Sequence, residues 1–283
     1  MNSRPKTLFA IHVPSKTNIG DAASTPIHYF RRLSEQFSIK VLSIGEPNTI
    51  EQIEAGAPVI IGGGGLLAGK PAWDQAILAA LRRSDRVIGW GIGLNRSLRS
   101  AALSPAKLPP YAGRFLSLGI RDQLPGTRWV PCASAMSSVF DLSYSVVRKY
   151  GIFLHSMRVE RVPADVREVM DGSNAITNQG GFQDFPAVVK FLGESECILT
   201  NSYHGMYWGI LLNKPVVVFD VFSEKFHHTK WKPEFLEVNG DLAGALKRAK
   251  RYDSALNEAR EANLSFFEEV YNQLTDDGFT MNG

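Results

Sequence analysis

Residues 200–220, TNSYHGMYWGILLNKPVVVFD, predict a helix followed by a strand, and the apolar run 197–200 predicts a strand before them. Short apolar runs of this kind are typical of buried parallel strands. Ser202 is a favourable N-cap residue. Apolar residues then recur at helical spacing until Pro215, which a helix interior does not tolerate. The β-branched run 216–219 predicts the next buried strand, so the unit is half of a parallel α/β layer.

His204 falls in the first turn of this predicted helix, at the carboxyl end of a strand. Open α/β sheets bind their ligands at that edge. Gly205 follows directly and lets a ligand or another backbone come close. The local sequence leaves two interpretations open: His204 takes part in acid–base chemistry, or it only caps the helix.

The composition indicates a globular protein with an ample core, because 44% of the 283 residues are hydrophobic and 21% are charged. That length suits two domains of ordinary size. The net charge of only +3 argues against strong binding to nucleic acid or to a membrane surface, and it leaves room for a local basic cleft.

Two cysteines, Cys132 and Cys197, cannot form a disulfide framework, and they fit a reducing cytoplasm. The first apolar run is too short for a signal peptide and is better explained as a strand. No stretch approaches the ~20 apolar residues of a membrane span. We therefore expect a cytoplasmic protein.

The first half of the chain alternates predicted strands and helices. Residues 18–21 lie between a predicted strand at 8–13 and a predicted helix at 22–37. Such junctions contact anions and substrates, which makes Asn18, Gly20 and Asp21 candidate substrate-binding residues. Asp21 can equally be the N-cap of the helix.

Two further predicted strands of this half, 58–61 and 86–90, end in glycine clusters at 62–65 and 89–93. Consecutive glycines cost entropy, so positive φ or close backbone approach is expected. The first cluster is not a dinucleotide fingerprint, because Leu67 occupies the position of the last glycine. A tight turn is the alternative. The candidate binding residues in the two clusters are Gly63, Gly64, Gly65, Gly91 and Gly93.

Arg121 directly follows a predicted strand at 115–120. A guanidinium there can bind a carboxylate or phosphate through two parallel hydrogen bonds. The alternative is a salt bridge with Asp122 or another surface acid.

Cys132 is most simply a small buried residue.

The second half repeats the alternation and predicts a second doubly wound layer. A basic loop at 222–230 follows the strand 216–219, and its Lys225 is a candidate cation for an anionic ligand. A solvated loop is the alternative. No cluster has zinc-ligand spacing. The predicted fold is α/β, with Rossmann-like domains at 1–145 and 146–283. Strands are predicted at 39–44, 150–155 and 174–177, and helices at 72–81, 163–170, 185–192, 241–252 and 254–274.

With these elements placed, the chain resembles the polysaccharide pyruvyl transferase family. The resemblance runs from the first strand to Asp220. Many members carry arginine ahead of the His-Gly pair, where this chain has Ser202 and Tyr203, and many end the segment after Arg121 in Asp-Pro, where this chain has 130–133, VPCA. The matching motifs, in family order, are 18–21 (NIGD), 62–66 (GGGGL), 89–93 (GWGIG), 120–122 (IRD), 200–205 (TNSYHG) and 213–216 (NKPV).

The resemblance implies a fold similar to the GT-B glycosyltransferases, with a cleft between two domains. It implies transfer of the enolpyruvyl unit of phosphoenolpyruvate to a sugar of a polymeric or lipid-linked glycan, forming a pyruvate ketal. No metal or other cofactor is implied, and the lipid-linked acceptor implies peripheral contact with the inner face of the membrane. His204 and Arg121 match the catalytic motifs. The remaining implied binding residues are Asn201, Ser202, Gly205 and the candidates named above.

Two other functions stay open from the sequence. One is a GT-B glycosyltransferase that uses a nucleotide-sugar, and the other is a non-catalytic sugar- or nucleotide-binding protein. In each case the strand ends of both halves are expected to face one crevice. For the pyruvyl transferase, the acceptor is expected mainly against the first half and the donor phosphate nearer His204 and Arg121.

Overall fold

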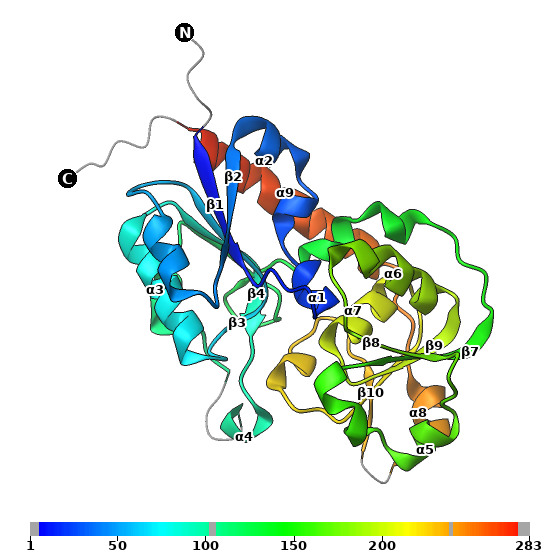
Figure 1. The fold of residues 1–283 in the computed structure, drawn as a ribbon. Helices are drawn as coiled ribbons and strands as arrows, with labels where there is room; N and C mark the ends of the chain where they lie inside the picture. The colour runs from blue at the N-terminus through cyan, green and yellow to red at the C-terminus, as the bar shows by residue number, and fades with distance from the viewer. Residues whose placement is uncertain (1–5, 102–105, 238–239, 277–283) are drawn as a thin grey trace.

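The computed structural model describes residues 6–101, 106–237 and 240–276, and it contains two parallel β-sheets with helices packed around them (Figure 1). The first sheet has six strands in the order β2-β1-β3-β4-β5-β6. Its strands are β1 (Thr7–His12), β2 (Ser38–Ser43), β3 (Val59–Leu67), β4 (Val87–Leu94), β5 (Ser117–Ile120) and β6 (Arg128–Trp129).

The second sheet has five strands in the order β11-β10-β9-β7-β8. Four of them match strands predicted from apolar runs. The three-residue β11 has no such run and was not predicted. The strands are β7 (Arg148–Leu154), β8 (Ala175–Thr177), β9 (Ser195–Thr200), β10 (Val216–Phe219) and β11 (Glu234–Leu236).

Both sheets have the same topology when each is numbered from its own first strand. In the first sheet β1 lies between β2 and β3, and in the second β7 lies between β8 and β9. The strand order therefore reverses beside β1 and beside β7. In doubly wound sheets the crevice at such a reversal is where ligands bind.

The helix predicted at 22–37 is wrong, because the segment is three short helices. Pro26 lacks a backbone N–H, so one continuous helix cannot run through it, and it is the first residue of a separate 3-10 helix. α1 (Ile19–Ala22) is followed by the 3-10 helix η1 (Pro26–His28) and by α2 (Arg31–Gln36). The other helices are α3 (Pro71–Arg83), α4 (Leu98–Ala101), α5 (Ala164–Glu168), α6 (Phe185–Gly193), α7 (Tyr203–Leu211), α8 (Leu242–Arg248) and α9 (Ala255–Thr275). The remaining helices of the described residues are 3-10 helices: η2 (Pro47–Gln52), η3 (Pro110–Arg114), η4 (Ala133–Met136), η5 (Ser138–Asp141), η6 (Ser156–Arg161), η7 (Phe182–Asp184) and η8 (Glu224–Phe226).

The glycine clusters lie inside strands rather than in tight turns, which corrects the alternative weighed above. β3 continues through all four glycines to Leu67, and β4 continues to Leu94. Protein groups occupy the space where side chains would be. A Cβ at Gly62 would overlap the Trp90 carbonyl oxygen, and a Cβ at Gly63 would lie 2.5 Å from the Ser24 carbonyl oxygen. The clusters therefore allow close packing within the first half.

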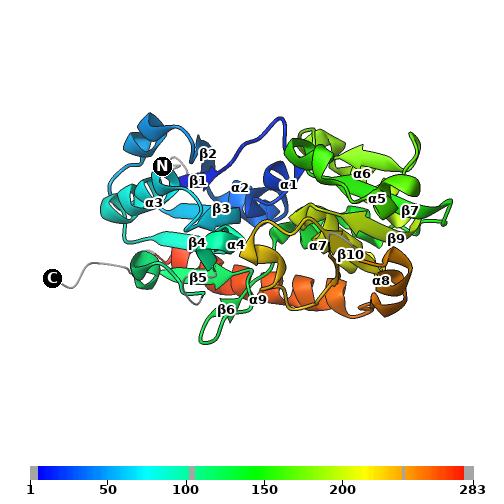
Figure 2. The same ribbon diagram turned by 90° about the horizontal axis from the view of Figure 1, so that it is seen from below.

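The C-terminal helix α9 packs against both sheets, as the view in Figure 2 shows. Its first turns, at Ala255 and Ala259, belong to the core of the second sheet. Its later turns, at Phe266 and Val270, belong to a core cluster of the first sheet. Trp90 in β4 donates a hydrogen bond to Asn263 of α9 over 2.9 Å. α9 thus packs against the cores of both sheets. The division into domains at 145/146 stays a prediction.

Candidate functional site

A cavity of about 260 Å³ opens between the carboxyl edges of the two sheets. Its walls come from segments that follow β1, β3, β4 and β5 on one side and β7, β8, β9 and β10 on the other. The strand ends of both halves therefore meet in one cleft, as the topology requires. The lining residues are Asn18, Asp21, Gly65, Leu66, Lys70, Trp73, Asn95, Arg121, His155, Met157, Asn178, Ser202, Tyr203, His204, Phe222 and Lys225.

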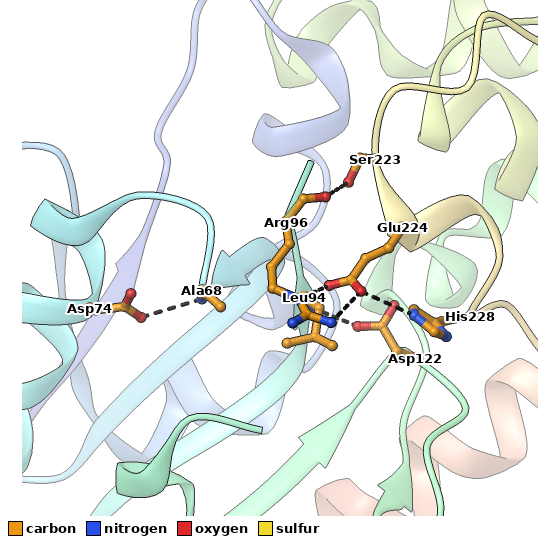
Figure 3. Close-up of polar contacts among 8 residues, drawn as sticks. All are labelled: Ala68, Asp74, Leu94, Arg96, Asp122, Ser223, Glu224 and His228. Atoms are coloured by element: carbon orange, nitrogen blue, oxygen red, sulfur yellow. Dashed lines mark hydrogen bonds and ion pairs between the residues drawn. The ribbon is translucent and has the colours of Figure 1, made fainter. Parts of the chain in front are cut away.

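Two loops, after β4 and after β10, join the halves beside this cavity. Ser97 and Ser223 form an antiparallel bridge between them. Arg96 and Glu224 form a two-pronged ion pair at 2.6 and 2.7 Å, which Figure 3 shows together with the hydrogen bond from Ser223 to the Arg96 carbonyl. Because the Glu224 side chain is only 4% exposed, this pair is largely shielded from water.

Arg121 is a buried cation that forms no ion pair with an acidic side chain of the described residues. It is 3% exposed, and its guanidinium carbon lies 4.0 Å from the centre of the Tyr203 ring. Within the described residues its side chain makes no hydrogen bond or ion pair, and its Nε is buried without a partner. The predicted alternative of a surface salt bridge with Asp122 is therefore wrong. An unpaired buried charge is costly, so a guanidinium held at a cavity wall favours an anionic ligand.

Lys225 adds a second cation to the same cavity. Its ammonium group donates a hydrogen bond to the Asn95 side chain over 3.2 Å. Burial, together with the charge of Arg121, lowers the pKa of Lys225 to about 8, while Asp21 and Asp122 oppose the shift. Lys70 is a third cation at the wall, against the single carboxylate of Asp21.

Asp21 lies inside α1, so the alternative that it caps the helix is wrong. Asn18 is the N-cap residue, and its side chain accepts a hydrogen bond from the Gly20 N–H. The same amide donates to Asp21 over 2.8 Å, which orients the carboxylate at the cavity. Burial raises the pKa of Asp21, although Lys225, Arg121 and Lys70 act in the opposite direction.

His204 lies in the first turn of α7 and is 7% exposed. Burial lowers its pKa well below the ordinary value, and the charges of Arg121 and Lys225 lower it further. The imidazole is therefore neutral at pH 7 in this structure, whereas an acid–base catalyst near neutrality was expected. Its position is set by Gly20, because a Cβ there would overlap the ring.

The remaining predicted residues divide between the cavity and its support. Ser202 lines the cavity as the N-cap of α7, and its side chain makes no capping hydrogen bond. Asn201 lies behind the wall, where its side chain accepts the His155 N–H over 2.7 Å. A Cβ at Gly205 would lie 2.5 Å from the Thr200 hydroxyl oxygen, so Gly205 permits packing of α7 on β9.

Most of the predicted binding glycines contact protein groups. Gly65 lines the cavity, and a Cβ there would lie 3.0 Å from a terminal nitrogen of Arg121. A Cβ at Gly93 would lie 2.5 Å from the Arg121 Nε, and one at Gly91 would lie 3.0 Å from the Pro131 carbonyl oxygen. Gly64 has room for a side chain but has a φ of +92°, which residues other than glycine rarely adopt. Gly65 and Gly93 therefore leave room for the Arg121 side chain.

Asp122, next to Arg121, is fully buried. Its carboxylate accepts the Leu94 N–H over 2.6 Å (Figure 3), and its other oxygen has no partner among the described residues. Burial raises the pKa of Asp122 to about 6, against the charge of Arg121 and the Leu94 hydrogen bond.

Sequence patterns missed several cavity residues. His155 and Asn178 follow β7 and β8, so the strand-end rule that selected His204 could have found them. Lys70 and Trp73, at the start of α3, carried no motif. The others are Leu66, Asn95, Met157, Tyr203 and Phe222.

Within residues 6–101, 106–237 and 240–276, no group of three or more His, Cys, Asp or Glu residues could hold a metal ion. No helix in those ranges combines the length and the apolar character needed to cross a bilayer.

Comparisons with known proteins give a distant likeness of shape. No protein-family model matches the chain, and no curated protein does. A functionally uncharacterised protein from Klebsiella pneumoniae is 13% identical, with a TM-score of 0.48, over 76% of this chain and 83% of its own. A Listeria monocytogenes structure described as a UDP-N-acetylglucosamine 2-epimerase is 10% identical, with a TM-score of 0.48, over 96% and 91% of the two chains. At TM-scores this low, neither likeness carries an argument about the activity of this chain.

Proposed function

We propose that this protein transfers the enolpyruvyl unit of phosphoenolpyruvate to sugar hydroxyls of a cell-surface polysaccharide or its lipid-linked precursor, forming a pyruvate ketal. The observation that carries the proposal is the buried Arg121, which has no acidic partner among the described residues and faces the same cavity as Lys225. Phosphoenolpyruvate carries a carboxylate and a phosphate close together. A fork-shaped guanidinium and a nearby ammonium suit such a ligand.

The size of the cavity supports a small donor. About 260 Å³ lies below the ordinary range for sites that enclose drug-sized ligands. A nucleotide-sugar needs more space and a contact for its base. We therefore place the nucleotide-sugar glycosyltransferase second, and the non-catalytic binding protein third.

The two sheets are proposed to be separate Rossmann-like domains in a GT-B-like arrangement. The order 2-1-3-4-5, which the first five strands of both sheets share, and the shared cavity support this. In this arrangement the donor lies against Arg121 and His204, and the acceptor approaches mainly from the first half. A lipid-linked acceptor would bring the protein to the inner face of the membrane.

The proposed chemistry begins with protonation of the methylene carbon of phosphoenolpyruvate. The neighbouring carbon becomes cationic, and a sugar hydroxyl oxygen bonds to it and gives up its proton. The C–O bond to phosphate then breaks, phosphate leaves with a proton, and a second hydroxyl closes the ketal and loses its own proton. His204 is the proposed acid and base.

His204 must take up a proton before it can act as an acid. A bound dianion would offset the charges of Arg121 and Lys225, two of the causes that lower the pKa of His204. Donor binding is therefore proposed to raise this pKa and to prepare the acid. The same cations would stabilise the leaving phosphate.

A donor screen followed by mass spectrometry tests the proposal. The purified protein is incubated with a panel of lipid-linked and polymeric glycans and either phosphoenolpyruvate or a nucleotide-sugar. We expect a pyruvylated glycan and free phosphate with phosphoenolpyruvate only. Release of nucleotide and a glycosylated product would instead establish the glycosyltransferase.

A further inference from the structure

A row of buried polar groups runs from the inner edge of His204 into the core. The His204 Nε2 lies 3.8 Å from the Cys132 sulfur. That sulfur lies 3.2 Å from the Ser134 hydroxyl oxygen, and the Trp208 indole N–H donates to the same hydroxyl over 3.0 Å. Cys132, Ser134 and Trp208 are all 0% exposed.

The donors and acceptors in this row fix the direction of its hydrogen bonds. An indole N–H can only donate, so the Ser134 oxygen must accept from Trp208. Apart from Trp208, the only partner of the Ser134 hydroxyl among the described residues is the Cys132 sulfur. If Ser134 donates to that sulfur, the thiol hydrogen is left to point at the His204 Nε2.

The reverse direction leaves a hydrogen unsatisfied. If His204 carried its proton on Nε2 and donated to Cys132, the thiol would have to donate to Ser134. The Ser134 oxygen would then receive two donors while its own hydrogen had no acceptor among the described residues. Buried polar hydrogens are rarely left without a partner.

The other edge of the ring lies on the side of the cavity. The imidazole atom nearest to a Cβ built on Gly20 is Nδ1. Gly20 belongs to α1, whose neighbouring residues Asn18 and Asp21 line the cavity. The two ring nitrogens therefore face different surroundings, with Nε2 toward Cys132 and Nδ1 toward the α1 segment.

We propose that Cys132 is a positioning residue that holds neutral His204 in the tautomer with its hydrogen on Nδ1. In the resting protein the nitrogen that faces the cavity is then Nδ1, whose hydrogen is donated to an anionic oxygen of the donor before His204 takes up its second proton. This catalytic consequence rests on the proposed function of the cavity. The tautomer itself does not, and it can be measured without any substrate.

Cys132 acts here as a thiol and not as a nucleophile. It is fully buried, and burial raises its pKa although the Ser134 hydrogen bonds oppose the shift. A neutral thiol supplies the single hydrogen that the row requires.

Nitrogen NMR of the ¹⁵N-histidine-labelled protein tests the tautomer directly. The protein has six histidines, and the His204→Gln variant identifies the His204 signals by their loss. We expect wild-type His204 to show a directly bonded proton on Nδ1 and none on Nε2. A directly bonded proton on Nε2, or rapid averaging of both forms, would overturn the proposal even if phosphoenolpyruvate proves to be the donor.

Variants of Cys132 test its part in this arrangement. Cys132→Ala removes the donor, so we expect loss of the single tautomer, whereas Cys132→Ser keeps a donor and should retain it. Cys197→Ala is the matched control, because Cys197 is also buried and donates to a carbonyl on β7, that of Lys149.

Turnover with phosphoenolpyruvate should fall about tenfold in Cys132→Ala with little change in KM, because a tenfold loss corresponds to roughly the free energy of one hydrogen bond. An unchanged Nδ1–H signal in folded Cys132→Ala would contradict the role of Cys132. If that variant does not fold, the wild-type spectrum alone decides the tautomer.

Discussion

His204 and Gly20 depend on each other at the level of single atoms. The imidazole occupies the space that a side chain at position 20 would fill, so the glycine in the 18–21 motif seats a residue far away in sequence. The sequence placed both residues at strand ends, but it gave no sign that they touch. That contact depends on how the two sheets face each other, which no local pattern encodes.

Gly20→Ala should displace the His204 ring. Gly20 is within α1 and has no positive φ, so alanine costs little in the backbone and acts through this overlap. We expect turnover to fall by ~10²-fold or more and the free energy of unfolding to fall by about 1–3 kcal/mol. Gly113→Ala is the control, because nothing lies within 4 Å of its Cβ. Steady-state kinetics and urea unfolding measure both effects, and wild-type turnover in Gly20→Ala would refute the coupling.

His204→Ala should lower turnover by ~10²–10⁴-fold, the usual loss when a general acid–base is removed. Donor binding should remain, because Arg121 and Lys225 are intact. His227→Ala, which changes an exposed histidine of the basic loop, should behave as wild type. A folded His204→Ala protein with full turnover would remove the catalytic assignment.

Asp122 should make the protein less stable as the pH rises. Burial raises its folded-state pKa from 3.8 to about 6, so the folded state binds this proton more tightly than the unfolded state. The stabilisation is present below about pH 4 and is lost as the pH rises through about 6. For a shift of this size the change is about 3 kcal/mol. In Asp122→Asn, unfolding measured from pH 4 to 7 should lack this decline, and parallel curves for the two proteins would show that the carboxyl does not titrate in this way.

At the scale of elements, apolar and β-branched runs predicted nine of the eleven strands in the described residues at least in part, because buried parallel strands need them, and they missed the short β6 and β11. Predictions failed where tertiary packing overrides local preference. The glycines of β3 and β4 left close backbone approach and a tight turn both open, and they form strand because neighbouring backbone and side chains fill the space beside them. Pro26 was a visible helix breaker inside a segment whose apolar spacing predicted one helix.

The two loops that join the halves depend on a nearly buried ion pair. Arg96→Ala would leave Glu224 without its main partner, so we expect the free energy of unfolding to fall by about 3 kcal/mol. The control is Arg31→Ala, which breaks an exposed pair with Glu35 and should cost at most ~0.5 kcal/mol. Denaturant unfolding at pH 7 measures both losses. Equal losses would mean that the Arg96–Glu224 pair stabilises the protein no more than an exposed ion pair does.

At the scale of the whole molecule, two sheets of the same strand order place their crevices against one another, and α9 packs on both. The α/β class and the meeting of strand ends at one cleft followed from the sequence. The burial of Arg121 without an acidic partner among the described residues did not, because it results from β4, β5 and α7 closing around one side chain. That combination of a shared crevice and an unpaired guanidinium is the basis for proposing a small anionic donor.

Calorimetric titration of phosphoenolpyruvate into wild type, Arg121→Lys and Arg121→Ala tests this most directly, since it needs no acceptor. Lysine keeps the charge but loses the two-pronged geometry. We predict that wild type binds phosphoenolpyruvate and not a nucleotide-sugar, that Arg121→Lys weakens binding by about tenfold or more, and that Arg121→Ala weakens it further. Arg31→Lys, on the exposed surface, should bind as wild type. Absence of binding to the wild type, or equal affinity in all three proteins, would contradict a donor held by Arg121.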